Sequence, residues 1–180
     1  MAELIHKAER TRIFDRTIER EVVKILPGDY YTTREDIALS TVLGSCVAAC
    51  IWDPKFGAGG MNHFMLPGGG SEAAGSPARY GLYAMEVLIN DLVKLGARKS
   101  ELRAKVFGGG KVLKNMTTLN VGARNATFVL EFLQLERIPV VARDLEDIYA
   151  RKVVFFPTTG RALVKRIDPS SDNELIRSET

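Results

Sequence analysis

The sequence predicts an α+β fold: a layered α/β sandwich in the order α-β-β, with helices on one face of a strand-rich body. Two segments repeat apolar residues every three or four positions, as amphipathic helices do. The other apolar segments are short and separated by turn-forming residues, which is typical of strands. The chain has 180 residues, enough for one domain with its own core.

The clearer helix is expected from Tyr80 to Leu95, where the apolar residues form one stripe. Gly96 follows it and is a residue type that commonly ends helices. A second helix is expected from Val121 to Glu136. Asn120, directly before it, is a residue type that caps helix starts.

The short apolar segments are expected to be strands. The run CVAACIW is small, apolar and continuous, as a buried strand should be. The first strand is expected to begin near Glu21. The others are expected at residues 37–41, 46–52, 60–65, 104–107, 140–145, 153–156 and 162–167.

Three parts of the chain are expected to lie outside this body. Residues 1–20 are charge-rich and are expected to form a peripheral N-terminal arm, and residues 169–180 a solvated C-terminal tail. A domain of residues 21–168 remains between them. Within it, the segment PGGGSEAAGSP from Pro67 to Pro77 is expected to be a mobile loop.

The composition, with 46% hydrophobic and 26% charged residues, is that of an ordinary globular protein. No apolar run approaches the ~20 residues of a membrane span, and the charged N-terminus lacks the apolar block of a signal peptide. We therefore expect a cytoplasmic protein without membrane insertion. The net charge of +3 could favour an acidic protein surface but is too small to indicate nucleic-acid binding.

The two cysteines are expected to stay reduced. Cys46 and Cys50 are four residues apart, which is ~13 Å along a strand. A disulfide needs Cα atoms within about 7 Å, so the strand excludes one and agrees with a reducing cytoplasm.

Cys46 and His63 are the residues best suited to chemistry. Cys46 begins one expected strand directly after Gly44 and Ser45, and His63 lies in the next strand. Paired strands lie ~4.8 Å apart, so a turn between them can bring the thiol and the imidazole together. The imidazole could then take the thiol proton, and the resulting ion pair would lower the thiol pKa.

Two further parts of an acyl-transfer site are expected near Cys46. The small residues Gly44 and Ser45 leave backbone amides exposed beside the sulfur, where they could stabilise an oxyanion. A third group that orients the imidazole would complete a triad. Ser40 or Thr41 is close enough in sequence to supply it.

Structural roles compete with these assignments. A cysteine in an apolar strand is usually a small core residue, and we expect that role for Cys50. Cys46 differs because it abuts a Gly-Ser turn. A zinc site is disfavoured because C-x3-C on a strand does not converge on one ion, and because His6 lies far away in the charged arm.

Two glycine-containing segments leave alternatives open. FGGGK, from Phe107 to Lys111, lacks the G-x4-G-K-[ST] spacing of a nucleotide-binding loop. It is either a turn that needs positive φ or a place where a substrate backbone comes close. NVGARN, from Asn120 to Asn125, either caps a helix or uses its amides and Arg124 to hold a polar substrate.

Taken in order, these motifs resemble the chemoreceptor glutamine deamidase family, CheD. The resemblance runs from about Glu21 to Ile167 and is specific as a set, although no single piece would be. It rests on LGSCVAACIWD, the Gly-Met-x-His of GGMNHFMLP, RYGLYAMEVLINDLVKLGA, AKVFGGGKVL, VGARN and RKVVFFPTTGRALVKRI. After the strand at 140–145 this chain has DLEDIYARKV, where some members carry Gly-Gly.

The resemblance implies a hydrolase that converts selected glutamines of methyl-accepting chemotaxis receptors into glutamate. It also implies methylesterase activity on such receptors and a fold similar to that of the cytotoxic necrotizing factor toxins. Neither a metal nor an organic cofactor is required. Some members bind the CheC phosphatase, which makes it a possible partner.

The resemblance places the nucleophile at Cys46 and its base at His63. The third residue of the family is a threonine upstream of the cysteine. A gapless comparison places Ser40 there, whereas Thr41 is the nearest threonine. We expect the oxyanion and substrate site to include Gly44, Ser45, Asn62, Gly108 and Gly109.

Two other functions share parts of this pattern. One is a module that docks on another chemotaxis protein, such as CheC, with its chemistry secondary or lost. The other is a generic cysteine peptidase with the same dyad. As the substrate of a deamidase we expect a protein helix rather than free glutamine. A free amino acid carries two charges that need fixed partners, and the motif segments are almost neutral.

Overall fold

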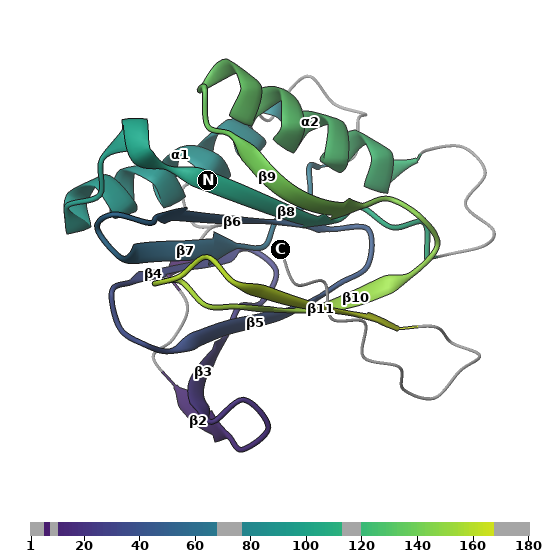
Figure 1. Cartoon of the computed structure of the whole chain (residues 1–180). Coiled ribbons are helices and arrows are strands. Elements are labelled where there is room, and N and C mark those ends of the chain that lie inside the picture. The colour runs from purple at the N-terminus through teal and green to yellow at the C-terminus, as the bar shows by residue number, and fades with distance from the viewer. Residues whose placement is uncertain (1–5, 8–10, 68–76, 113–119, 168–180) are drawn as a thin grey trace.

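The computed structural model describes residues 6–7, 11–67, 77–112 and 120–167. Two sheets stack face to face, and two helices cover the outer face of one of them (Figure 1). The mixed α+β fold with α-β-β layering is therefore confirmed. The closer comparison with the cytotoxic necrotizing factor fold stays a prediction.

The helix-covered sheet has the order β1-β4-β7-β6-β8-β9. Its strands are β1 (His6–Lys7), β4 (Asp29–Thr33), β6 (Val47–Asp53), β7 (Ala58–Asn62), β8 (Arg103–Gly108) and β9 (Val140–Leu145). β6 pairs antiparallel with β7 and β8, and all of its residues are buried. The predicted buried strand is therefore confirmed, and Cys46 directly precedes it.

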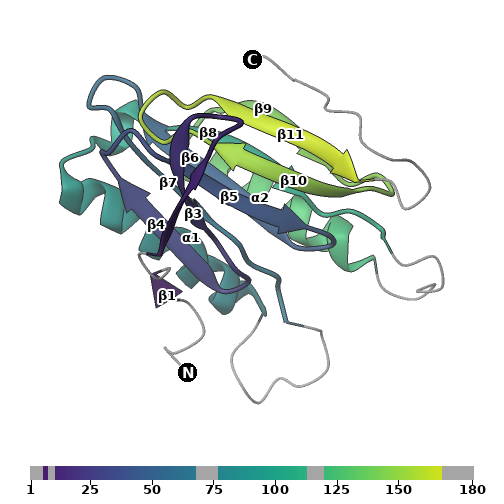
Figure 2. The same ribbon diagram turned by 90° about the horizontal axis from the view of Figure 1, so that it is seen from below.

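The second sheet has the order β11-β10-β5-β3-β2. Figure 2 shows the molecule from below, with this sheet towards the viewer. Its strands are β2 (Arg12–Asp15), β3 (Arg20–Lys24), β5 (Ala38–Leu43), β10 (Ala150–Phe155) and β11 (Ala162–Ile167). β2 differs from the expectation of an arm up to residue 20, because it pairs antiparallel with β3 as an edge strand. Its residues Ile13 and Phe14 are mostly exposed, so little burial marks this strand in the sequence.

The helices are α1 (Pro77–Leu95) and α2 (Val121–Leu135), with a short 3-10 helix, η2 (Lys99–Glu101), between them in the chain. Both expected helices are confirmed. Gly96 has φ 118° directly after α1, a conformation that glycine adopts readily. The Asn120 side chain accepts a hydrogen bond from the Ala123 N–H, which confirms the predicted cap of α2.

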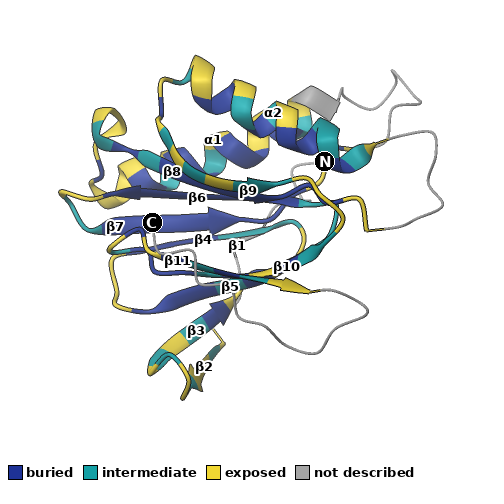
Figure 3. Ribbon diagram, turned by 45° about the vertical axis from the view of Figure 1, so that its right-hand side comes forward, coloured by how far each residue is buried: buried dark blue, intermediate teal, exposed yellow. Residues whose placement is uncertain are grey.

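The protein has two apolar layers, visible as the dark interior faces in Figure 3. One lies between the helices and the first sheet and includes Leu88 and Val129. The other, the inter-sheet core, lies between the two sheets and includes Leu39, Phe155 and Cys50. Cys50 is fully buried there, as its predicted core role requires, and both cysteines are free thiols.

Two expectations lie wholly or largely outside the described residues: the loop from Pro67 to Pro77 and the tail 169–180. Among the described helices, none has the length and apolar character needed to cross a membrane.

Candidate active site

Cys46 lies at the edge of the inter-sheet core, half-buried, at the start of β6. A β-bridge pairs Val47 with Phe64, so His63 falls opposite Ala48. Residues two apart on a strand share a face, and Cys46 therefore faces the same side of the sheet as His63. They are diagonal neighbours, with backbones about 7–8 Å apart, a separation that side chains can span.

Burial keeps both candidate reactive groups neutral. Burial raises the pKa of the Cys46 thiol, and the residue's own backbone N–H opposes this only in part. Burial also lowers the pKa of His63 from 6.5 to about 4. Within the described part of the chain, no hydrogen bond joins the Cys46 thiol to His63. The expected lowering of the thiol pKa by an ion pair is therefore wrong for the resting site, because desolvation disfavours both charged forms.

A chain of hydrogen bonds fixes the tautomer of His63. The Thr41 hydroxyl lies 2.6 Å from the Ile25 carbonyl oxygen and 2.7 Å from His63 Nδ1. The carbonyl can only accept, so Thr41 donates its one hydrogen to Ile25 and accepts from His63 Nδ1–H. A neutral imidazole with a proton on Nδ1 has an unprotonated Nε2, which is free to act as a base.

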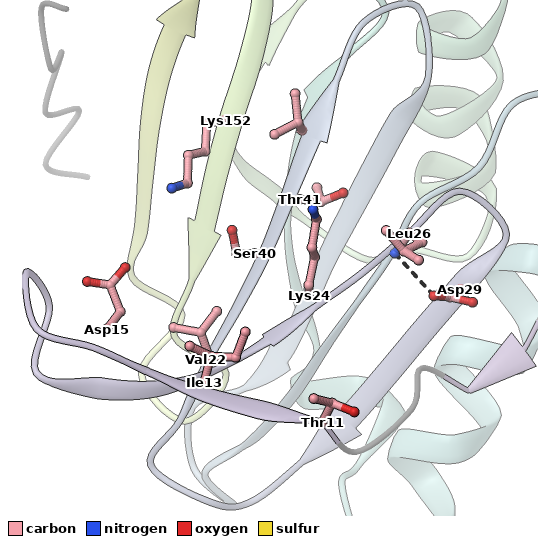
Figure 4. A pocket seen from close by; sticks show the side chains of 11 residues that line it. Thr11, Ile13, Asp15, Val22, Lys24, Leu26, Asp29, Ser40, Thr41 and Lys152 are labelled. Carbon is pink, nitrogen blue, oxygen red and sulfur yellow. Dashed lines mark hydrogen bonds between the residues drawn. The ribbon is translucent and has the colours of Figure 1, made fainter.

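Thr41, not Ser40, is therefore the partner of His63. Neighbouring residues on a strand point to opposite faces, so only one of the two can reach the inter-sheet core from β5. A pocket of about 770 Å³ opens on the outer side of the second sheet, where Ser40 lies beside Lys24 and Lys152; Thr41 also contributes to its lining, although its hydroxyl is bonded to Ile25 and His63 (Figure 4). The described residues that line this pocket include neither Cys46 nor His63.

Hydrogen bonds to the carbonyl groups of residues 44–46 hold the backbone of this turn in place. Gly110 N–H donates to the Gly44 carbonyl at 2.9 Å, and Gly109 N–H donates to the Cys46 carbonyl at 2.8 Å. Asn125 Nδ2 donates to the Ser45 carbonyl between them, also at 2.8 Å.

The hydrogen bonds to the Gly44 and Ser45 carbonyls orient the two candidate oxyanion donors, the N–H groups of Ser45 and Cys46. In a trans peptide the N–H points opposite to the carbonyl, and the described chain has no cis bond. The N–H groups of Ser45 and Cys46 are therefore directed away from the groups that hold Gly44 and Ser45. No oxygen of the described residues accepts a hydrogen bond from either N–H, so both can receive an oxyanion.

Gly108 and Gly109 lie close to the chain's own backbone. Their φ values are 106° and 67°, so the predicted turn with positive φ is confirmed. A Cβ on Gly108 would lie 2.2 Å from the Cys46 carbonyl oxygen, and one on Gly109 would lie 2.7 Å from that of Gly122. This loop supports the Cys46 turn, and the placement of these two glycines in the substrate site stays a prediction.

Asn62 also lies elsewhere than expected. Its Oδ1 accepts from Ala49 N–H at 2.9 Å, and its Nδ2 donates to the Ala84 carbonyl of α1 at 3.3 Å. Because it precedes His63, its side chain leaves the sheet on the opposite face, towards the helices. Asn62 is therefore a bridge between β6 and α1.

The comparisons with known proteins agree with one another. A family model described as CheD chemotactic sensory transduction matches residues 65–166. "Probable chemoreceptor glutamine deamidase CheD" of Janthinobacterium sp. (strain Marseille) is 53% identical, over 99% of this chain and 90% of that protein. This chain belongs to the CheD family.

A second CheD relative, with the same printed name, comes from Methylobacillus flagellatus. It is 58% identical over 92% of this chain and 84% of that protein. Among solved structures, Bacillus licheniformis hypothetical protein YfiH matches 82% of this chain and 64% of its own, at 12% identity and a TM-score of 0.42. That likeness is too slight to carry an argument.

Three residues around this site differ from the sequence analysis: Arg124 has another role than the one considered, and Asn125 and Arg151 were missed. Arg124 donates to the Leu66 and Pro67 carbonyls at 3.0 and 2.8 Å, so its guanidinium holds the chain rather than a free substrate. Asn125 was not singled out at all, although it ends the VGARN motif. Its full burial at the start of α2 is a tertiary property that the motif does not reveal.

Arg151 is the second missed group and is fully buried. It donates to the Gly108 carbonyl at 3.4 Å and to Asp144 at 3.2 Å. It therefore ties the glycine loop to β9 and, through a further bond to the Glu146 carbonyl, to the segment after β9. In that segment Glu146 and Asp147 have φ values of 64° and 66°, a conformation easier for the Gly-Gly that some CheD members carry.

The described residues contain no cluster of metal-ligating side chains. No group of three or more His, Cys, Asp or Glu side chains within them could hold a metal ion.

His63 should make the stability of this CheD protein depend on pH. Its pKa is about 4 when folded and near 6.5 when unfolded. Between these values only the unfolded chain binds the proton, so this contribution is complete above pH 6.5 and is lost as pH falls towards 4. The full difference is on the order of 3 kcal/mol.

We expect the free energy of unfolding in urea to be lower at pH 4.5 than at pH 7. In the wild type this loss should exceed the part that comes from carboxylates alone. The reference is His63→Gln, because glutamine does not titrate while all the carboxylates of the chain are unchanged. An equal pH dependence in both proteins would contradict the buried neutral imidazole.

Proposed function

We propose that this chain is a protein-glutamine deamidase that hydrolyses selected glutamine side chains of methyl-accepting chemotaxis receptors, with Cys46 as nucleophile. One observation carries the proposal. A half-buried thiol lies beside the backbone N–H groups of Ser45 and Cys46, which donate to no oxygen of the described residues, and on the same sheet face as a histidine with a free Nε2. The CheD relatives, named as probable chemoreceptor glutamine deamidases, supply the substrate class.

The first chemical step forms a tetrahedral intermediate, which becomes a thioester only when ammonia leaves in the second step. Cys46 Sγ attacks the side-chain carbonyl carbon of the glutamine while His63 Nε2 takes the thiol proton. Because both groups are neutral at rest, proton transfer accompanies the attack instead of preceding it. Catalytic hydrogen bonds are often long before substrate binds, and the Cys46 side chain closes its distance to His63 at this stage.

The second step expels ammonia. The tetrahedral oxyanion accepts hydrogen bonds from the N–H groups of Ser45 and Cys46. The imidazolium of His63, held through Nδ1 by Thr41, gives its proton to the departing nitrogen. Water activated by Nε2 then attacks the thioester, which releases glutamate and restores the thiol. No metal or organic cofactor takes part.

A receptor methyl ester can enter the same cycle with methanol as the leaving group, so methylesterase activity belongs to the proposal. So do a fold relationship to the cytotoxic necrotizing factors and a cytoplasmic location, which two free cysteines fit. Docking to a CheC-type phosphatase is the second candidate function, and family membership supports it.

The surroundings of Cys46 fit a protruding glutamine of a protein helix better than free glutamine. Met65 is 46% exposed and contacts Ser45, and the partly exposed Val112 lies beside Gly44. Burial, and to a smaller extent the charge that Cys46 would carry as a thiolate, raise the pKa of Tyr80, so this phenol stays neutral. These neighbours are apolar or neutral, so they offer no fixed partners for the charges of a free amino acid.

Cys46→Ala should abolish the reaction, and Cys50→Ala should preserve it, because Cys50 is fully buried in the inter-sheet core. The measurement is ammonia release together with the intact mass of a folded receptor fragment, which gains about one dalton per converted glutamine. Receptor binding without ammonia release would favour the docking module, and chain cleavage would favour a peptidase. A folded but inactive Cys50→Ala variant would move the nucleophile away from Cys46.

Thr41→Val and Ser40→Ala should separate the two candidate third residues. Thr41→Val removes the acceptor of His63 Nδ1–H while keeping the side-chain shape, and we expect kcat to fall by about 100-fold. Ser40→Ala should keep kcat within about twofold, because Ser40 faces the outer pocket. Circular dichroism checks that both variants fold. A larger loss in the Ser40 variant would reverse the assignment.

A further inference from the structure

We propose that Asn125 is a positioning residue that aims the Cys46 N–H at the oxyanion of the reaction. The proposal deepens, and rests on, the deamidase function proposed above. Asn125 is the fifth residue of α2 and is fully buried. Its side chain holds the peptide that joins Ser45 to the nucleophile Cys46.

Its orientation follows from its partners. Leu66 N–H can only donate and lies 3.0 Å from Asn125 Oδ1. The Ser45 carbonyl can only accept and lies 2.8 Å from Asn125 Nδ2. The amide therefore has one possible orientation in which both bonds form.

The Ser45 carbonyl and the Cys46 N–H belong to the same peptide group. A hydrogen bond on the carbonyl fixes the plane of that peptide and so the direction of its N–H. It also polarises the peptide, because hydrogen bonds in series strengthen one another. Asn125 thereby acts on the proposed oxyanion donor without touching the substrate.

The same side chain joins the two segments that carry the thiol and the imidazole. Leu66 follows His63 by three residues, and Ser45 precedes Cys46 by one. Arg124 reinforces the connection by donating to the Leu66 carbonyl. Gly110 holds the neighbouring Gly44 carbonyl in a similar way, but through backbone, so Asn125 is the link that a substitution can remove.

Two reactions of Cys46 separate oxyanion positioning from general loosening. Acylation by p-nitrophenyl acetate forms the Sγ–acetyl bond, expels p-nitrophenolate and passes through an oxyanion. Alkylation by iodoacetamide forms the Sγ–CH₂ bond, expels iodide and forms no oxyanion. The ratio of the two rates therefore measures oxyanion stabilisation at one thiol. Cys46→Ala supplies the background for both reagents.

The variants are Asn125→Leu, which keeps the branching and the number of side-chain heavy atoms, and Asn125→Ala. Val129→Ala is the matched control, because Val129 is fully buried on the same helix but packs in the apolar layer above the first sheet. Circular dichroism selects the Asn125 variant that folds.

We expect acylation to fall by about 10- to 100-fold in the Asn125 variants, somewhat less than the loss of a whole oxyanion donor. Alkylation should stay within about threefold of wild type, and Val129→Ala should keep the wild-type ratio. An Asn125 variant with an unchanged ratio overturns the proposal, as does a Val129→Ala variant with the same fall in ratio. Wild-type protein that acylates but never releases ammonia from receptor fragments refutes the deamidase function alone, and the ratio still decides the role of Asn125.

Discussion

The hydrogen-bond chain from Ile25 through Thr41 to His63 is the constraint on which the rest of the site depends. It crosses the inter-sheet core: Thr41 lies on β5 of one sheet, and His63 directly follows β7 of the other. Both side chains are almost completely buried, so water cannot replace either partner. Because bonds of 2.6 and 2.7 Å tolerate little displacement, the state of the imidazole is set by how the two sheets pack.

The helix layer completes the site from the other side of the first sheet. The start of α2 brings Asn125 to the Ser45 carbonyl, and the loop after β8 brings Gly109 and Gly110 to the neighbouring carbonyls. The bonds to the Gly44 and Ser45 carbonyls hold two peptides whose N–H groups, those of Ser45 and Cys46, point the opposite way. The N–H of the third peptide, that of Val47, donates to the Phe64 carbonyl. The glycines are needed where they are because a Cβ at Gly108 would collide with the Cys46 carbonyl. A candidate oxyanion site thus emerges from a turn that supplies no charged side chain.

The sequence indicates the local parts of this arrangement but not their mutual orientation. Periodicity places both helices and the buried strand after Cys46, and the Gly-Ser turn marks that cysteine. The choice between Ser40 and Thr41 depends on which face of β5 meets the other sheet, which is a tertiary property. The direction of Asn62 follows from the same alternation. The neutral state of His63 comes from burial by distant segments, and no local pattern encodes it.

The most direct test of this account is the tautomer of His63, observed by ¹⁵N NMR of the imidazole. The chain contains two histidines, so a His6→Gln variant assigns the signals. The account predicts a neutral ring between pH 6 and 8, with Nδ1 protonated and Nε2 bare, and loss of this fixed state in Thr41→Val. A ring protonated on Nε2, or an imidazolium at neutral pH, would contradict it.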